Sequence, residues 1–221
     1  MRFDLDIYSD TICPWCFIGK HRLRKALAAL DSRHEVSVTW RPFRLNPQMR
    51  RGGMDRKAYR SAKFGSWEES LSLDAKVEAV GKAEGIPFAH DRIRRTPDTF
   101  DAHRLVWLAR REDLQDSVVE TLFRAYFVEG VDVGDPENLI AMASVAGLNA
   151  ERTERFLGGD DGADAVRAEE ANARRMGVSG VPFFVIGGKY GVSGALEART
   201  LVSLFDQFAR LTQEGSESVA G

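Results

Sequence analysis

Apolar and polar residues alternate in two short segments near the start of the chain, a pattern typical of β-strands. The segments are residues 3–8 (FDLDIY) and residues 36–43 (VSVTWRPF). Between them, apolar residues recur at helical spacing and predict a helix from about residue 14 to residue 30: Phe17, Leu23, Leu27 and Leu30. The first 44 residues therefore predict a β-α-β unit.

Residues 45–177 contain no convincing strand pattern and predict a series of helices. Thr96-Pro97 predicts a helix start, because threonine caps helices and proline is favoured at the first helical position. Asp135-Pro136 predicts another start, and Gly147 predicts the end of that helix. We expect this part of the chain to be entirely helical.

Strand character returns in the segment PFFVI at residues 182–186, which Gly187-Gly188 separates from KYGVS at residues 189–193. This arrangement predicts a β-hairpin, and a final helix follows it. The order of elements resembles a thioredoxin fold with a large all-helical domain inserted between its βαβ and ββα halves. We therefore predict an α/β protein with a thioredoxin-like domain (1–44 and 178–213), a helical insertion (45–177) and a disordered tail (214–221).

Composition narrows the classes of partner. The 221 residues include 31 Lys and Arg against 33 Asp and Glu, for a net charge of −2, which argues against a general nucleic-acid binder. No apolar run approaches the roughly 18 to 20 residues that a membrane span needs. The N-terminus lacks the basic start and apolar run of a signal peptide. We expect a cytoplasmic protein that binds neither nucleic acid nor membranes.

The two cysteines of the chain, Cys13 and Cys16, lie together in the segment TICPWCFIGK. A structural disulfide gains stability by closing a long loop, and a two-residue gap closes almost none. Half of a zinc site is the main alternative to redox chemistry, but such sites usually need four Cys or His ligands. No second cysteine pair exists and the four histidines show no ligand spacing. We therefore predict a redox-active pair and no metal site.

The position of the pair, at the turn from the first strand to the first helix, assigns a role to each sulfur. A helix N-terminus offers a positive dipole end and unpaired N–H groups, which favour the thiolate of Cys13 as the attacking group. Cys16, one turn further on, would lie deeper and resolve the mixed disulfide. Pro14 fits the first turn without losing a hydrogen bond. Trp15 would offer an apolar surface to a peptide or small thiol.

Five segments carry a family resemblance: DTICPWCFIGK, WRPFRLNP, TFDAHRLVWLA, LFRAYFVEG and GVSGVPFFVIGGKYGVSGA. Together they resemble the DsbA-like thioredoxin family, particularly its cytoplasmic FrnE-like branch, over residues 3–212. The resemblance implies a thiol–disulfide oxidoreductase with Cys13 as nucleophile, Cys16 as resolving thiol and Pro182 as a cis-proline packed against them. It also implies that the backbone of Val181 pairs with substrate.

The chain departs from the family pattern in two ways. Pro-Trp stands between the cysteines where secreted DsbA oxidants have Pro-His, so their strong oxidising power is not implied. Some FrnE-like proteins carry an additional cysteine pair near the C-terminus, and this chain has none. An intramolecular relay of electrons between two cysteine pairs is therefore not implied either.

Two further features allow both a structural and a functional interpretation. His103 shares a helical face with Phe100 and Trp107. We favour a buried core histidine, and the alternative is a contact with the thiolate or the substrate. The basic run at residues 50–63 is interpreted by default as a solvated surface, and the alternative is a site for a substrate carboxylate.

Three functions remain open at this point. The first is a thiol–disulfide oxidoreductase acting as reductase, oxidase or isomerase on protein or small-thiol disulfides. The second is a glutathione-dependent isomerase or transferase of the kappa kind, a class that typically carries Ser at the position of Cys13. The third is a non-catalytic redox sensor or accessory protein of a biosynthetic pathway. We expect a monomer or homodimer with no tightly bound cofactor, and glutathione or another low-molecular-weight thiol as the candidate co-substrate.

Overall fold

A four-stranded sheet forms the centre of the protein, as the computed structural model shows for residues 1–30 and 34–217. The strand order is β2-β1-β5-β6, where β1 and β2 are parallel and β5 is antiparallel to both of its neighbours. The strands are β1 (Arg2–Ser9), β2 (Glu35–Pro42), β5 (Phe183–Ile186) and β6 (Tyr190–Ser193). The strands and the hairpin predicted from the sequence are confirmed. Gly187 and Gly188 both have positive φ, as the two-residue hairpin turn requires.

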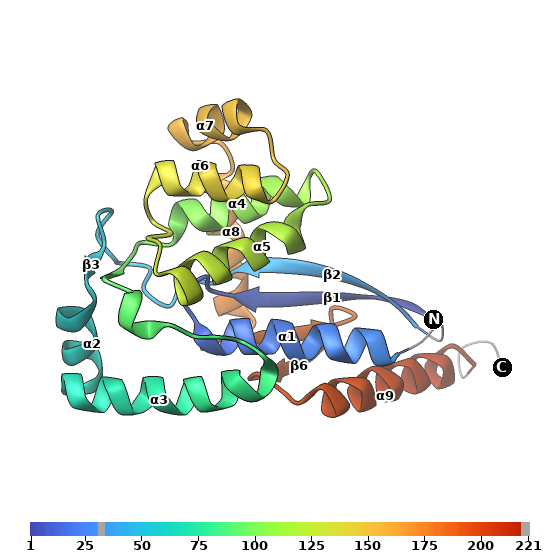
Figure 1. The fold of residues 1–221 in the computed structure, drawn as a ribbon. Coiled ribbons are helices and arrows are strands. Elements are labelled where there is room, and N and C mark those ends of the chain that lie inside the picture. Colours follow the sequence, from blue (N-terminus) through green and yellow to red (C-terminus); the bar gives the residue numbers. More distant parts are fainter. Residues whose placement is uncertain (31–33, 218–221) are drawn as a thin grey trace.

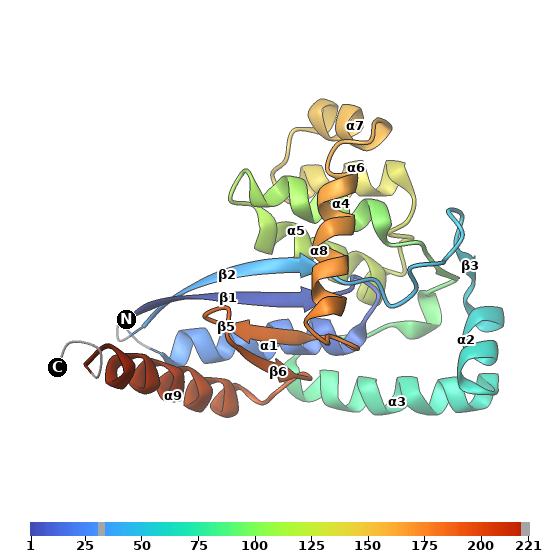
Figure 2. The same cartoon turned by 180° about the vertical axis from the view of Figure 1, so that it is seen from behind.

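Helices cover both faces of the sheet (Figures 1 and 2). The inward residues of β1, Leu5 and Ile7, are fully buried in one core with α1 (Pro14–Ala29) and α9 (Ala198–Glu217). The opposite face packs Tyr8 and Val185 against α8 (Ala163–Arg175), which crosses in front of the sheet in Figure 2. Alternation along β1 therefore supplies both cores.

The remaining helices form two groups in Figure 1. One group stacks beside β2 and comprises α4 (Phe100–Arg110), α5 (Gln115–Arg124), α6 (Pro136–Val145) and α7 (Ala150–Gly158), with a π-helical turn η3 (Ala125–Glu129) after α5. The other group, α2 (Arg56–Phe64) and α3 (Trp67–Glu84), reaches past the end of the sheet at which β1 leads into α1. A 3₁₀ turn η2 (His90–Arg92) lies between the groups in the chain. Within residues 1–30 and 34–217, no helix combines the length and apolar character needed to cross a lipid bilayer.

Three local predictions were wrong. Two short strands, β3 (Met54–Asp55) and β4 (Arg95–Thr96), pair within the stretch expected to be all helical, because two-residue strands show no periodicity in a sequence. Thr96 belongs to β4 rather than to a helix cap, so α4 begins later, after Thr99. The predicted tail at residues 214–221 is helical as far as Glu217, where α9 ends. Residues 218–221 lie outside the described part of the chain.

The predicted domain boundaries coincide only in part with the packing. The proposed insertion at residues 45–177 includes α8, yet Ala173 of α8 shares a core with Tyr8, Phe43 and Val185 of the sheet region. Figure 2 shows α8 lying across the sheet, whereas α6 and α7 lie away from it. The division of the chain into a thioredoxin-like domain and an insertion remains a proposal.

An ion-pair cluster joins α1 to α5 and gives the fold a testable pH dependence. Lys20 of α1 lies 3.3 Å from Glu120 and 2.8 Å from Asp116 of α5. Burial alone would raise the pKa of Glu120, but His21, whose Nε2 lies 3.9 Å from the carboxylate, and the charge of Lys20 lower it from 4.5 to about 2. A lowered carboxyl pKa adds stability that is complete above about pH 4.5 and is lost as the pH falls toward 2.

We expect Glu120→Gln to lower the free energy of unfolding at pH 7 by about 2–3 kcal/mol. The variant should also lack the loss of stability that the wild type shows between about pH 4.5 and pH 2. Urea unfolding at a series of pH values measures both effects. The exposed Glu68, replaced by Gln, is the matched control and should behave as the wild type does. Parallel pH profiles for wild type and Glu120→Gln would contradict this account.

Candidate active site

Cys13 stands at the point where the chain turns from the sheet into α1. It is the N-cap residue of α1, with extended backbone, and Pro14 follows at the start of the helix. The Cys13 N–H donates to the Asp10 carbonyl at 3.0 Å, and the Cys13 carbonyl accepts from the N–H of Cys16 at 3.0 Å. No side-chain hydrogen bond caps this helix. The Cys13 sulfur therefore lies at a helix N-terminus, as the sequence predicts.

The segment before β5 faces the Cys13 sulfur. The Cys13 thiol donates to the Val181 carbonyl, with 3.4 Å between sulfur and oxygen. The Val181–Pro182 peptide bond is cis. Pro182 packs closely on α1, since a Cβ added to Gly19 would lie 3.2 Å from its Cγ. Residues 168 positions apart in the sequence thus form one surface.

Cys16 lies directly behind Cys13 and is fully buried, whereas Cys13 keeps 4% of its surface exposed. Both thiols are free. Burial raises the pKa of Cys16 well above its ordinary value, and the hydrogen bond and charge of Cys13 raise it further. The neighbouring Ser9 hydroxyl and Asp10 backbone act in the opposite direction. At neutral pH the inner sulfur therefore holds its proton.

This difference predicts the order of alkylation. Iodoacetamide at mildly acidic pH should modify Cys13 at least tenfold faster than Cys16, because the reagent reacts with thiolates and Cys16 is both protonated and enclosed. Fragmentation mass spectrometry of the peptide that contains both cysteines locates the label. Equal labelling, or labelling of Cys16 first, would contradict the assignment of the two sulfurs.

A cavity of about 440 Å³ opens beside the Cys13 sulfur. Four of the residues predicted from the sequence line it: Cys13, Pro14, Trp15 and Val181. Trp15 is 40% exposed, so its ring forms part of the rim, as expected. The far wall comes from α2, which lies beyond the N-terminal end of α1 in Figure 1, and from α3, which runs back from α2 toward α1. A volume of this size is in the range of pockets that hold small molecules.

His103 lies away from this cavity. Its side chain is 4% exposed, and its Nε2 is 3.4 Å from Oδ1 of Asp10, which is completely buried. The other carboxylate oxygen of Asp10 accepts the N–H of Leu45 at 2.7 Å. His103 is therefore a buried histidine that supports the loop before Cys13. Its burial agrees with the favoured interpretation as a core histidine and gives no support to the alternative, a contact with the thiolate or the substrate.

The sequence analysis missed the buried charges beneath the cysteine turn. Arg44 donates to both carboxylate oxygens of Glu170 at 2.9 Å, which links the end of β2 to α8. Burial alone would raise the pKa of Glu170, but the hydrogen bonds from Arg44 hold it below its ordinary value, and the charge of His103 contributes. A signal for Asp10 was present, since an acidic residue follows a buried strand and precedes the cysteines. No comparable signal identified Glu170.

The basic run at residues 50–63 proved to be more than a solvated surface. Arg56 is 5% exposed, and both Arg56 and Arg60 donate to the Asp74 carboxylate at 2.7 Å. Arg56, Arg60 and Lys63 all line the cavity beside Cys13. The default interpretation of this run was therefore wrong for Arg56, because α3 covers it and supplies the Asp74 carboxylate that compensates its charge.

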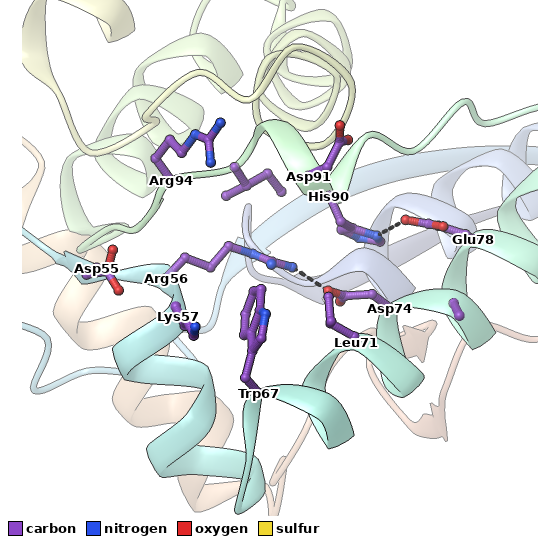
Figure 3. A pocket seen from close by; sticks show the side chains of 12 residues that line it. Asp55, Arg56, Lys57, Trp67, Leu71, Asp74, Glu78, His90, Asp91 and Arg94 are labelled. Carbon is purple, nitrogen blue, oxygen red and sulfur yellow. Dashed lines mark hydrogen bonds and ion pairs between the residues drawn. The ribbon is translucent and has the colours of Figure 1, made fainter.

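A second cavity of about 520 Å³ adjoins the first, and Figure 3 shows the side chains that line it. Arg56, Asp74, His90 and Ile93 line both cavities. Figure 3 shows Arg56 extending over the Trp67 ring toward Asp74, and His90 pointing toward Glu78, to which it is hydrogen-bonded at 2.9 Å. Within residues 1–30 and 34–217, no three His, Cys, Asp or Glu side chains are grouped so that they could hold a metal ion.

A cysteine pair at the start of the first helix of such a sheet, facing the segment that opens a β-hairpin, defines a thioredoxin-like protein. The family model of the DSBA-like thioredoxin domain matches residues 4–206. The chain belongs to this family, and the predicted fold class is confirmed. Family membership supports an oxidoreductase role.

Three known proteins illustrate what the chain is similar to. The crystal structure of a probable DsbA oxidoreductase from Streptomyces coelicolor is 36% identical, with a TM-score of 0.85 over 93% of this chain and 89% of that one. The cytosolic disulfide reductase DsbM from Pseudomonas aeruginosa, solved with GSH, is 21% identical, with a TM-score of 0.61 over 96% and 98% of the two chains. The uncharacterized protein YwbO of Bacillus subtilis (strain 168) is 25% identical over 192 residues, which are 85% of this chain and 88% of YwbO.

Proposed function

We propose that the protein is a thiol–disulfide oxidoreductase whose Cys13–Cys16 pair alternates between dithiol and disulfide. The observation that carries the proposal is the placement of the two sulfurs. Cys13 lies at a helix N-terminus beside an open cavity, and Cys16 is buried directly behind it. The substrates are disulfides of proteins or of small thiols, including glutathione. We propose a cytoplasmic protein of the FrnE-like branch that acts as a monomer or homodimer.

The reaction proceeds in two exchange steps. The Cys13 thiolate attacks one sulfur of the substrate disulfide, so that a mixed disulfide forms and the other substrate sulfur leaves as a thiolate. Cys16 then loses its proton and attacks the Cys13 sulfur, which forms the Cys13–Cys16 disulfide and releases the second substrate thiol. The substrate gains two electrons and the protein loses two. The reverse sequence oxidises a substrate dithiol.

The surroundings of the sulfurs fit these steps. The raised pKa of Cys16 keeps its sulfur protonated while Cys13 reacts with the substrate. Cys16 is needed only afterwards, when it attacks the Cys13 sulfur of the mixed disulfide. Trp15 and Pro14 offer an apolar surface beside the reacting sulfur, and we propose that they contact the substrate. The Val181 carbonyl, which accepts from the Cys13 thiol, and the adjoining Pro182 are proposed to align the substrate backbone.

A glutathione-dependent isomerase or transferase of the kappa kind needs only one group at the glutathione sulfur. The buried position of Cys16 behind Cys13, within hydrogen-bonding reach, is unnecessary for such a reaction and necessary for disulfide exchange. A sensor that reports oxidation to a partner could use the same geometry. Catalytic turnover of disulfides distinguishes the oxidoreductase from such a sensor. Turnover is therefore the quantity to measure.

The test is the reduction of insulin by dithiothreitol, together with the reduction of oxidised glutathione. The wild type should accelerate at least one reaction in proportion to its concentration, and Cys13→Ala should return the rate to the uncatalysed value. Conjugation of glutathione to an electrophile is assayed in parallel. If conjugation occurs without any disulfide turnover, the protein is a glutathione transferase or isomerase instead of an oxidoreductase. If neither reaction occurs, the redox sensor is the function that remains.

A further inference from the structure

The wall of the cavity that faces Cys13 carries an excess of positive charge. Four basic side chains and, among the described residues, a single acidic one line this cavity: Arg56, Arg60, Lys63 and Lys76 against Asp74. His90 also lines it, but burial lowers the pKa of His90, so the ring is neutral at pH 7. A chain with a net charge of −2 thus presents a local cationic surface next to its proposed reactive sulfur.

The basic residues differ in how far their charge is already compensated. Arg56 and Arg60 share the one Asp74 carboxylate, and Arg60 also donates to the Ser70 hydroxyl. Burial lowers the pKa of Arg60, while Asp74 acts in the opposite direction and Arg56 lowers it further. An additional carboxylate at this wall would therefore meet incompletely neutralised guanidinium charge.

Lys63 and Lys76 are the groups free to receive such a carboxylate. Both are exposed, and neither forms an ion pair with any residue in 1–30 or 34–217. Lys63 donates to the Tyr59 hydroxyl at 2.8 Å, which holds its ammonium group at the cavity edge. Lys63 comes from α2 and Lys76 from α3, so the two charges approach the cavity from different elements.

The remainder of the lining is largely apolar and the access to sulfur is restricted. Leu45, Phe64, Ile93 and Phe127 are among the apolar residues that line the same cavity. Cys13 keeps only 4% of its surface exposed, so a substrate sulfur has to enter this cavity to reach it. Pockets with apolar walls and a few charged groups orient small ligands by those groups.

We propose that this cavity selects small disulfides that carry a carboxylate, with the substrate sulfur at Cys13 and the carboxylate held by Lys63 and Lys76. The inference rests on the proposed function, because it needs Cys13 to be the attacking sulfur. It adds the substrate class and the residues of α2 and α3 that recognise it. Opposite charge in a partly enclosed site stabilises the encounter and the transition state alike.

Three disulfides of similar size test the charge requirement: dithiodipropionate with two carboxylates, bis(2-hydroxyethyl) disulfide without charge, and cystamine with two ammonium groups. The oxidation of the reduced protein is followed by stopped-flow tryptophan fluorescence, to which Trp15 beside the sulfurs contributes. Each rate constant is divided by that of the same disulfide with free 2-mercaptoethanol, which removes its intrinsic reactivity. The wild type should prefer the dicarboxylate over the neutral disulfide by about tenfold, and cystamine should react most slowly.

The double variant Lys63→Gln and Lys76→Gln should lose this preference, so that its normalised rate constants with the dicarboxylate and with the neutral disulfide become equal. Lys57→Gln is the control variant. Lys57 is exposed on α2, as Lys63 is, but it lines only the second cavity. Its replacement removes one positive charge from the same helix. Its preference should equal that of the wild type. Both variants remove surface charges, so neither is expected to impair folding.

The outcomes separate the two proposals. If no disulfide oxidises the reduced protein, the proposed function itself fails. If all three disulfides give equal normalised rates, disulfide exchange stands and the carboxylate preference is wrong. If the preference persists in the double variant, or is lost in Lys57→Gln, the assignment to Lys63 and Lys76 is overturned.

Discussion

Replacement of Cys16 by alanine is expected to turn the protein into a trap for its substrate. Cys13 still attacks a disulfide, but no internal thiol then releases the mixed disulfide. Incubation of Cys16→Ala with oxidised glutathione should therefore give one persistent glutathione adduct per chain on Cys13. Disulfide turnover should fall at least a hundredfold. Intact-protein mass spectrometry measures the adduct, and the insulin assay measures the turnover.

Cys13→Ala is the matched control for this experiment. It retains a cysteine, but Cys16 is completely buried and its thiol pKa is raised, so no adduct should accumulate. An adduct on Cys16 in that variant would show that Cys16, and not Cys13, is the attacking sulfur. Undiminished turnover in Cys16→Ala would show that the second sulfur has no part in the reaction.

Asp74→Asn should be the most destabilising single change in the wall of the cavity. The Asp74 carboxylate is 5% exposed and accepts from both Arg56 and Arg60 at 2.7 Å. An asparagine of the same shape carries no charge and directs an NH₂ group at one of the two donors. Removal of one member of a buried ion pair costs about 3–5 kcal/mol, and we expect a loss of about 3 kcal/mol here.

Urea unfolding measures this loss as a lower midpoint with an unchanged slope. Asp91→Asn is the control, because Asp91 lines the second cavity next to the same wall but is exposed and forms no ion pair with the described residues. It should stay within about 0.5 kcal/mol of the wild type. A similarly small effect of Asp74→Asn would mean that the two arginines do not depend on this carboxylate.

The elements that touch the sulfurs were predictable from the sequence because their signals are local. A strand, a helix start and a cysteine pair occur within the first 16 residues, and the hairpin follows directly from Pro182. Each signal depends on neighbours a few positions away, which a periodicity or a capping pattern reports.

The far wall of the cavity was not predictable in the same way. The pairing of Arg56 with Asp74 joins two helices across a gap of 18 residues. A basic run has the same composition whether it faces solvent or another helix. The contact between Asp10 and His103 likewise depends on how α4 packs on the sheet. Local sequence patterns contain no information on such packing.

The short strands β3 and β4 show the same limit. Met54 and Thr96 pair across 42 positions, and two residues are too few for any alternation to appear. Their pairing moves the start of α4 from Thr96 to Phe100. Tertiary pairing therefore overrode a cap signal that was sound on local grounds.

Redox titration of the cysteine pair is the most direct test of the central claim. The protein is equilibrated in buffers with different ratios of reduced to oxidised dithiothreitol and, to reach higher potentials, of reduced to oxidised glutathione, and the fraction of disulfide is read from free-thiol labelling. We predict a single reversible two-electron transition in which both thiols disappear together and Cys13 and Cys16 become linked. A pair that keeps two free thiols in fully oxidised buffer, or that links different chains instead, would contradict the account.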